Sequence, residues 1–197
     1  PTVELPGIKF NSGKPNPLQI SGEKKWYSGD YKGALEDFDE LIKEEPNNAY
    51  AFFSRGSALL KLGKLQEAMD DTNKALELNP NIAKAYETRG VAKELMGNKG
   101  GALLDFNRAI EIDENFSSAY ANRGAVKSDL GNYEGALIDL NKALEIDPNL
   151  AYGYRLRAKN YDRQGNMTDA CKDMKKASSL GNQEATRLLK DNPGECK

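Results

Sequence analysis

The sequence predicts an all-α fold built from stacked helical repeats. Two columns of small residues keep the same spacing along the chain without a slip, one of glycine at Gly29, Gly63, Gly97, Gly131 and Gly165, and one of alanine at Ala34, Ala68, Ala102, Ala136 and Ala170. Apolar side chains between these columns recur at helical spacing. The repeating unit is as long as the spacing from Gly29 to Gly63, and it holds two helical stretches. A repeat of this kind is typical of a solenoid, in which each unit buries its apolar face on its neighbours.

The clearest copy of the unit spans residues 117–150 and predicts two short amphipathic helices. The residues at the expected contact are Tyr120, Gly124, Lys127 and Leu130 on the first helix and Ala136, Leu140, Ala143 and Leu144 on the second. The small members of this set let two antiparallel backbones approach closely. Gly131-Asn132 is expected to end the first helix, because both residues tolerate the left-handed backbone. Pro148 helps to end the second helix, because proline disfavours helix in the residue before it.

In chain order, residues 1–14 predict an extended arm, because they contain prolines and glycines and show no helical period. The arm carries Val3, Leu5, Ile8 and Phe10, which could dock on a groove of the same or a neighbouring molecule, and a disordered leader is the alternative. The absence of an initiating Met is consistent with removal of an upstream segment, such as a signal peptide.

Five repeats follow over residues 15–184, at 15–48, 49–82, 83–116, 117–150 and 151–184. In the first repeat Trp26 is either an aromatic anchor for a ligand or a residue that covers the end of the stack. Residues 185–197 are expected to form a capping helix and a tail, with Ala185, Leu188 and Leu189 on the buried side.

The register of these repeats resembles the tetratricopeptide repeat family over about residues 15–184. The large position of the first helix holds Leu18, Phe52, Tyr86, Tyr120 and Tyr154. The small position of the same helix holds Gly22, Gly56, Gly90, Gly124 and Ala158. The bulky position of the second helix holds Phe38, Thr72, Phe106, Leu140 and Met174. Thr72 departs from the family pattern, as do the residues just before the small position, which are Ser21, Arg55, Arg89, Arg123 and Arg157. The resemblance implies a right-handed superhelical solenoid whose first helices line a concave groove.

That groove would hold a peptide or protein segment. The register of the family selects Tyr50, Phe53, Ser57, Leu60, Glu87, Val91, Asn122, Tyr152, Arg155 and Lys159 as groove residues. This set is apolar in the second repeat and basic in the last, which fits a peptide with an apolar anchor near Phe53 and Leu60 and carboxylates near Arg155 and Lys159. The competing interpretation is a solvated helix face, on which exposed ion pairs contribute only about 0–1 kcal/mol.

One subtype of the family clamps the terminal carboxylates of chaperones with Lys and Asn at fixed positions. This chain has Glu87 and Val91 where that Lys and Asn belong, and Tyr152 and Leu156 in the following copy. A role as a co-chaperone of that kind is therefore not expected.

Cys171 and Cys196 leave two interpretations open. Cys171 occupies a position that holds Leu35, Met69, Leu103 and Leu137 in the other repeats, so a small buried hydrophobe explains it. Cys196 lies beyond the predicted cap and could fold back to form a disulfide. A disulfide would indicate an exported or periplasmic protein, and two free thiols a cytoplasmic one.

The composition favours a binding protein over an enzyme. The chain has no histidine, and 28 Lys+Arg against 30 Asp+Glu give a net charge of -2. The most common general base is thus missing. The sequence has no phosphate-binding glycine loop and no metal-ligand spacing. The paired carboxylates, such as Asp70-Asp71, are expected on solvated helix faces. We expect no cofactor, no nucleic-acid partner and no membrane span.

Two function classes remain at this stage. The first is an adaptor whose groove binds a protein or peptide. The second is a structural protein that forms homo-oligomers through its repeat ends or its arm.

Overall fold

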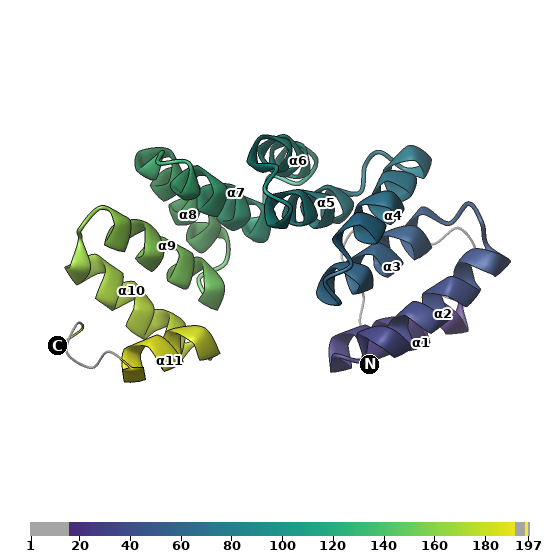
Figure 1. Ribbon diagram of the computed structural model, residues 1–197, viewed down its shortest axis with the longest axis horizontal. Helices are drawn as coiled ribbons and strands as arrows, with labels where there is room; N and C mark the ends of the chain where they lie inside the picture. The colour runs from purple at the N-terminus through teal and green to yellow at the C-terminus, as the bar shows by residue number, and fades with distance from the viewer. Residues whose placement is uncertain (1–15, 192–195, 197) are drawn as a thin grey trace. The chain divides into compact units, whose positions relative to one another are not determined.

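The computed structural model describes residues 16–191 and Cys196. The arm residues Val3, Leu5, Ile8 and Phe10 lie outside the described residues. No described residue is in a β-strand. The helices are α1 (Pro17–Ser28), α2 (Tyr31–Glu44), α3 (Ala49–Lys61), α4 (Leu65–Leu78), α5 (Ala83–Leu95), α6 (Lys99–Ile112), α7 (Ser117–Asp129), α8 (Tyr133–Ile146), α9 (Ala151–Arg163), α10 (Met167–Ser179) and α11 (Gln183–Asp191) (Figure 1).

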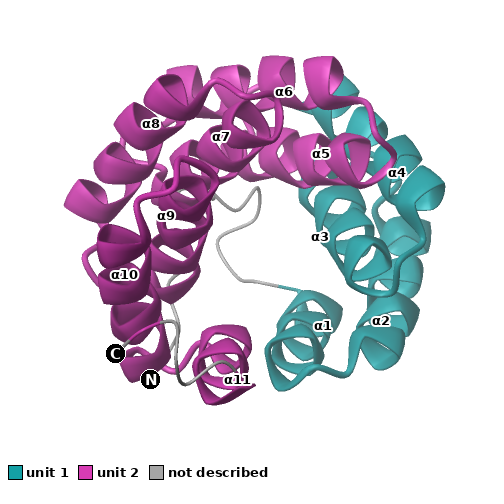
Figure 2. Cartoon of the chain, turned by 60° about the vertical axis from the view of Figure 1, so that its left-hand side comes forward, with its two compact units in different colours: residues 1–80 teal, residues 81–197 magenta. Residues whose placement is uncertain are grey.

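Helices follow one another in antiparallel pairs, and each pair corresponds to one repeat (Figure 1). We refer to the first helix of each pair, α1, α3, α5, α7 and α9, as the A helices, and to the second, α2, α4, α6, α8 and α10, as the B helices. The chain divides into two compact units, residues 1–80 and residues 81–197. Within unit 2, α5, α7 and α9 form one layer and α6, α8 and α10 the other, whereas in unit 1 α1 and α3 face α2 and α4 (Figure 2).

Close helix contact depends on glycine at the small position of the A helices. A Cβ atom on Gly90 would lie 2.7 Å from Cε1 of Phe106, and one on Gly124 would lie 2.9 Å from Cγ of Leu140. Phe106 and Leu140 are fully buried. The bulky side chain of the B helix therefore occupies the space that the glycine of the A helix leaves open, as the register predicts.

Thr72 stands at the bulky position of the second repeat without disturbing this packing. Its side chain is fully buried, and its hydroxyl donates to the carbonyl of Ala68, one turn earlier, at 2.8 Å. The polar group is thus satisfied inside its own helix.

In the turn between the two helices of a repeat, the glycine and the residue after it have different roles. Gly131 has a φ of 81°, in the left-handed region. Asn132 instead keeps a φ of -84°, and its side chain accepts a hydrogen bond at 2.9 Å from the backbone N–H of Gly135. The expectation that Asn132 shares the left-handed role is therefore wrong, because the residue caps α8.

Two residues expected at the helix contact of the fourth repeat have other roles. Leu130 is 54% exposed, because it is the C-cap of α7, where the helix that would turn it toward α8 has ended. The ammonium of Lys127 pairs with the carboxylate of Asp139 at 2.7 Å. The remaining positions of that contact are buried or partly buried, including Ala136 and Ala143, which are fully buried.

The last helix packs on the preceding B helix. α11 contacts α10, and Ala185 is fully buried there. Leu188 is 36% exposed, so its assignment to the buried side is wrong. Cys171 in α10 forms a disulfide with Cys196, with the two Cα atoms 5.2 Å apart. The C-terminal end of the described chain is therefore tied covalently to the last repeat. None of the helices in the described ranges has both the length and the hydropathy needed to cross a membrane.

Candidate functional site

Each A helix from the second repeat onward is held to its B helix by a buried arginine–aspartate pair. Arg123 donates two hydrogen bonds to Asp139, at 2.8 and 2.6 Å, and Asp139 is 2% exposed. Arg157 and Asp173 repeat this geometry at 2.6 and 2.9 Å. The hydrogen bond to Asp139, opposed by burial, raises the pKa of Arg123, so the guanidinium stays charged. Bidentate pairs of this kind stabilise the contact and also fix the orientation of the two side chains.

The same arginines connect neighbouring repeats. Arg123 also donates to Asn107 of the preceding B helix at 2.8 Å, and Arg157 donates to Asn141 at 2.6 Å. Each guanidinium lies over the aromatic ring three residues earlier, with Arg123 5.3 Å from the ring centre of Tyr120. The unusual arginine column is therefore structural. Its partners Asp71, Asp105, Asp139 and Asp173 form an aspartate column, which Asp37 continues in the first repeat, where it pairs with Lys25 instead.

This column corrects one expectation about the carboxylates. Asp70 is exposed, as expected, but Asp71 is only 7% exposed and accepts two hydrogen bonds from Arg55, both at 2.7 Å. The assignment of Asp71 to a solvated face is wrong, because the helical period turns it toward α3. The signal that would have found it is the aspartate column.

The A helices also carry side chains that are not needed for these pairs. In unit 1, α1 and α3 contact each other, and the hydroxyl of Tyr50 donates to Oε1 of Glu23 at 2.6 Å. Burial, together with this hydrogen bond, raises the pKa of Tyr50. Phe53 packs edge-on against Tyr50, with ring centres 5.9 Å apart, and is 9% exposed. The structure therefore brings Tyr50 and Phe53 together, whereas Ser57 and Leu60 lie further along α3, each half-buried.

Trp26 and Tyr27 extend this aromatic group at the end of α1. Trp26 is partly buried against the core around Phe38, and its ring lies 5.2 Å from that of Tyr27. Tyr27 is 62% exposed, and the Lys61 ammonium lies 5.9 Å from the Trp26 ring centre. Trp26 is thus mainly a packing residue, and Tyr27 presents the accessible aromatic surface. The groove register points to Tyr27, whose position in the first repeat matches that of Lys61 in the second.

In unit 2, polar contacts join neighbouring A helices. The side-chain amide of Asn122 in α7 donates to Oε1 of Glu87 in α5 at 3.1 Å. Tyr152 of α9 packs with the cluster around Ala121 and Leu140, and burial, followed by the nearby charge of Glu87, raises its pKa. Glu87, Asn122 and Tyr152 therefore belong to one region of unit 2. Val91 instead packs partly buried beside Phe106.

The predicted basic residues of the last repeat each have a carboxylate partner. Nε of Arg155 lies 3.4 Å from Oε2 of Glu184, at the start of α11. Nζ of Lys159 lies 3.5 Å from Oδ1 of Asp129 in α7, and Arg163 contacts the same oxygen. An acidic ligand at these residues would have to replace Glu184 and Asp129.

Asp129 is the centre of a charged cluster in unit 2. Burial alone would raise its pKa, but the hydrogen bond from Arg163 and the charges of Lys159, Arg163 and Lys99 outweigh burial and lower it. The pKa of Glu94 in α5 shifts the other way and is raised. Burial is the larger cause and the charge of Asp129 the next, and together they outweigh the charges of Lys159 and Lys99, which lower it. The cluster is therefore nearly balanced rather than strongly basic.

Models of the tetratricopeptide repeat match residues 22–81, 83–116 and 117–150 of the chain. Together with the paired helices, these matches decide the family. The chain belongs to the tetratricopeptide repeat family. Comparison with curated proteins finds no significant match for this tetratricopeptide repeat protein.

Solved tetratricopeptide repeat structures resemble the chain over most of its length. A crystal structure of MamA is 27% identical, with a TM-score of 0.65, and the match covers 84% of this chain and 96% of that one. TTC0263, a thermophilic protein of Thermus thermophilus, is 22% identical with a TM-score of 0.76, over 89% and 95% of the two chains. YrrB, described as having an unusual peptide-binding site, is 21% identical with a TM-score of 0.62, over 91% and 94%. The last two likenesses show the fold alone.

Proposed function

We propose that this tetratricopeptide repeat protein is an adaptor that binds a segment of a partner protein on the exposed side of its A helices. The family and the likeness to MamA support a general role as a scaffold for protein interactions. Proteins of this fold are typically scaffolds rather than enzymes.

The observation that carries the proposal is the contrast between two sets of positions on the same helices. Residues that pack the helices recur in every repeat, as the glycine, alanine and aspartate columns do. Residues on the exposed side of the A helices change from repeat to repeat. One equivalent position holds Tyr27, Lys61, Leu95, Asp129 and Arg163, and none of the five is buried. Packing sets no common requirement at that position, so a role in selecting a ligand is a natural explanation for its variation.

The aromatic group of unit 1 is the best candidate for an anchor site. Tyr27 exposes most of its ring beside Trp26, and Tyr50 and Phe53 provide a rigid base. Aromatic rings of this kind dominate binding energy at protein interfaces. We infer a partner segment with an apolar or aromatic anchor here. An acidic segment at Arg155 and Lys159 of unit 2 remains a separate part of the proposal, and it requires exchange for Glu184 and Asp129.

The test is selection of binders from a random peptide library against the wild-type protein, followed by titration of one selected peptide. Tyr27→Ala removes an exposed ring and should weaken binding by about ten-fold, the effect of one interface anchor. The matched control is Leu104→Ala, which removes another exposed apolar side chain, 70% exposed on the B helix α6. Equal affinities of the Tyr27 variant and the wild type would reject the anchor site.

The same preparation tests self-assembly as the competing function. Mass in solution is measured by light scattering with and without residues 1–14. A mass that grows with concentration, and only in the presence of these residues, would reject the adaptor function in favour of homo-oligomer formation.

We also infer that the protein works in an oxidising compartment. The support is the pairing of Cys171 with Cys196, because structural disulfides form and persist outside the reducing cytosol. Alkylation of protein taken directly from native cells would find both thiols blocked. Two reactive thiols would place the chain in a reducing compartment instead.

A further inference from the structure

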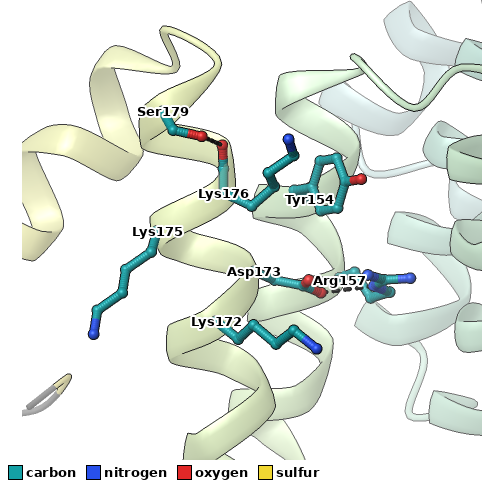
Figure 3. Close-up of a pocket in the computed structure, with 7 residues that line it drawn as sticks. All are labelled: Tyr154, Arg157, Lys172, Asp173, Lys175, Lys176 and Ser179. Atoms are coloured by element: carbon teal, nitrogen blue, oxygen red, sulfur yellow. Dashed lines mark hydrogen bonds and ion pairs between the residues drawn. The ribbon is translucent and has the colours of Figure 1, made fainter.

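The last repeat carries a pocket on the side of its B helix. The pocket has a volume of about 570 Å³ and is lined by Tyr154, Arg157, Lys172, Asp173, Lys175, Lys176 and Ser179 (Figure 3). These residues come from α9 and α10. Four of the lining side chains are cationic and one is a carboxylate, so the pocket is strongly positive in a protein whose net charge is -2.

The single carboxylate does not neutralise the lysines. Asp173 is 4% exposed, and both of its oxygens accept hydrogen bonds from Arg157. Within residues 16–191, Lys172, Lys175 and Lys176 make no ion pair. Lys176 instead lies with its ammonium 6.0 Å from the ring centre of Tyr154. Among the described residues, these three lysines therefore have no counter-charge in an ion pair.

Comparison with the other repeats shows that this positive charge is specific to the last one. Each earlier repeat pairs the residue equivalent to Lys176 with a residue of opposite charge one turn later, as in Lys142–Glu145 at 2.9 Å and Arg108–Glu111 at 2.9 Å. The last repeat has Ser179 in place of that glutamate, and the Ser179 hydroxyl donates to the carbonyl of Lys176 at 2.8 Å.

The other two lysines also replace uncharged residues. Lys175 stands where the two preceding repeats have Asn107 and Asn141, which accept hydrogen bonds from the next arginine. Lys172 stands where those repeats have Leu104 and Ile138. Three positions thus change in one repeat, and each change leaves a lysine that makes no ion pair within residues 16–191.

Packing gives no reason for this arrangement. Like charges three or four residues apart on a helix destabilise it by a few tenths of a kcal/mol per pair, and Lys172 has this spacing to both Lys175 and Lys176. No carboxylate of residues 16–191 offsets this cost by an ion pair, so an acidic ligand would do so.

We propose that the α9–α10 pocket binds an acidic segment of a partner protein, with aspartate or glutamate side chains on Lys172, Lys175 and Lys176. The three ammonium groups point in different directions, with Lys175 directed away from Lys172 and Lys176 (Figure 3). Several carboxylates spaced along a chain can reach them, whereas one small anion cannot. This site lies in unit 2 and shares no residue with the aromatic anchor site of unit 1, so it stands independently of that anchor site.

The test is fluorescence anisotropy with labelled hexaglutamate, a probe that has no apolar anchor. Replacing both Lys172 and Lys175 by Gln should weaken binding by about five-fold or more. Ser179→Glu gives Lys176 the partner that the earlier repeats have, and it should also weaken binding, by about three-fold. Circular dichroism checks that each variant keeps its helices.

The matched control for Ser179→Glu is Thr168→Glu, which makes the same change of charge at an exposed position of α10 outside the pocket lining. Its affinity should stay within about two-fold of the wild type, because screening weakens distant charges. Equal losses for both glutamate variants would overturn the site in favour of general attraction.

Two further measurements separate this site from other ligands. Replacing Arg155 and Lys159 by Gln tests the acidic part of the proposed function separately. It should weaken hexaglutamate binding less than the Lys172 and Lys175 replacement does, and a loss confined to the Arg155 and Lys159 variant would move the acidic ligand to the A helices. Competition by inorganic phosphate as strong as by unlabelled hexaglutamate would show a small-anion site and overturn the peptide assignment.

Discussion

Gly90 and Gly100 lie on neighbouring helices of unit 2 but have opposite relations to their surroundings. A Cβ on Gly90 would meet the buried ring of Phe106, whereas a Cβ on Gly100 would meet nothing within 4 Å. Gly90→Ala should therefore destabilise the protein by about 1–3 kcal/mol through overpacking. Gly100→Ala should stabilise it by about 0.4–1 kcal/mol, because alanine loses less backbone entropy in a helix.

Urea unfolding followed by circular dichroism measures both changes. The two substitutions add the same methyl group, so their difference isolates the helix contact from helix propensity. If Gly90→Ala were as harmless as Gly100→Ala, the close approach of α5 and α6 would not depend on the glycine.

Glu94 gives a prediction about pH. Burial and the charge of Asp129 raise its pKa in the folded protein above the ordinary value of 4.5, against the attraction of Lys159 and Lys99. Between the ordinary and the raised pKa the folded state binds a proton that the unfolded state has lost. The contribution of Glu94 to stability therefore falls as the pH rises through this window.

Glu94→Gln removes this titration. The variant should unfold with nearly the same free energy as the wild type at pH 4 and should be the more stable of the two at pH 7. Urea midpoints for both proteins at the two pH values provide the check. A Glu94→Gln variant less stable than wild type at pH 7 would show that the cations, rather than burial, dominate at this carboxylate.

At the scale of the helices, the arginine–aspartate pairs differ in how much support each aspartate has. Asp139 is held by Arg123 and also by Lys127, whereas Asp173 is held by Arg157, and its repeat has Tyr161 where Lys127 would be. Arg157→Ala should leave a buried carboxylate without its cation and cost about 3–5 kcal/mol. Arg123→Ala should cost less, about 2 kcal/mol, because Lys127 remains.

Chemical denaturation of the two single variants tests this order. Adding Asp173→Ala to Arg157→Ala should recover part of the loss, since the unpaired charge is then gone. If the two arginine variants were equally destabilised, Lys127 would contribute nothing to holding Asp139.

The helix pairs could be predicted from the sequence because their signals repeat. The register of the helix contacts follows from the glycine and alanine columns and from the bulky residues opposite them. The matches to models of the tetratricopeptide repeat agree with this register. Leu130 was misassigned because periodicity alone does not show where a helix ends. The arginine pairs were missed because two charged residues in different helices become partners only when the helices are placed side by side.

The candidate binding surfaces were less predictable, because they do not repeat. The pairing of Arg155 with Glu184 joins α9 to the last helix, α11, and no column indicates it. The lysines of α10 were visible in the sequence. That they make no ion pair within residues 16–191 becomes informative only beside the paired residues of the earlier repeats, such as Lys142 with Glu145.

At the scale of the whole molecule, a repeat protein does not unfold as one unit, because each repeat is stabilised only by itself and its neighbours. The disulfide between Cys171 and Cys196 closes a loop with a sequence separation of 25 at the C-terminal end of the chain. A loop of this size corresponds to ~3 kcal/mol in the chain-entropy model. Its contribution should therefore be confined to the helices that it encloses.

Replacing both cysteines by Ser should increase hydrogen exchange in α11 by roughly 100-fold, since its contact with α10 would no longer be tied. Exchange in α1 to α4 should stay unchanged, because unit 1 ends at residue 80. Hydrogen exchange followed by mass spectrometry measures both regions in one experiment, and a reducing agent should have no further effect on the variant. Equal acceleration in unit 1 would mean that the chain unfolds cooperatively from end to end, and the local account of its stability would be wrong.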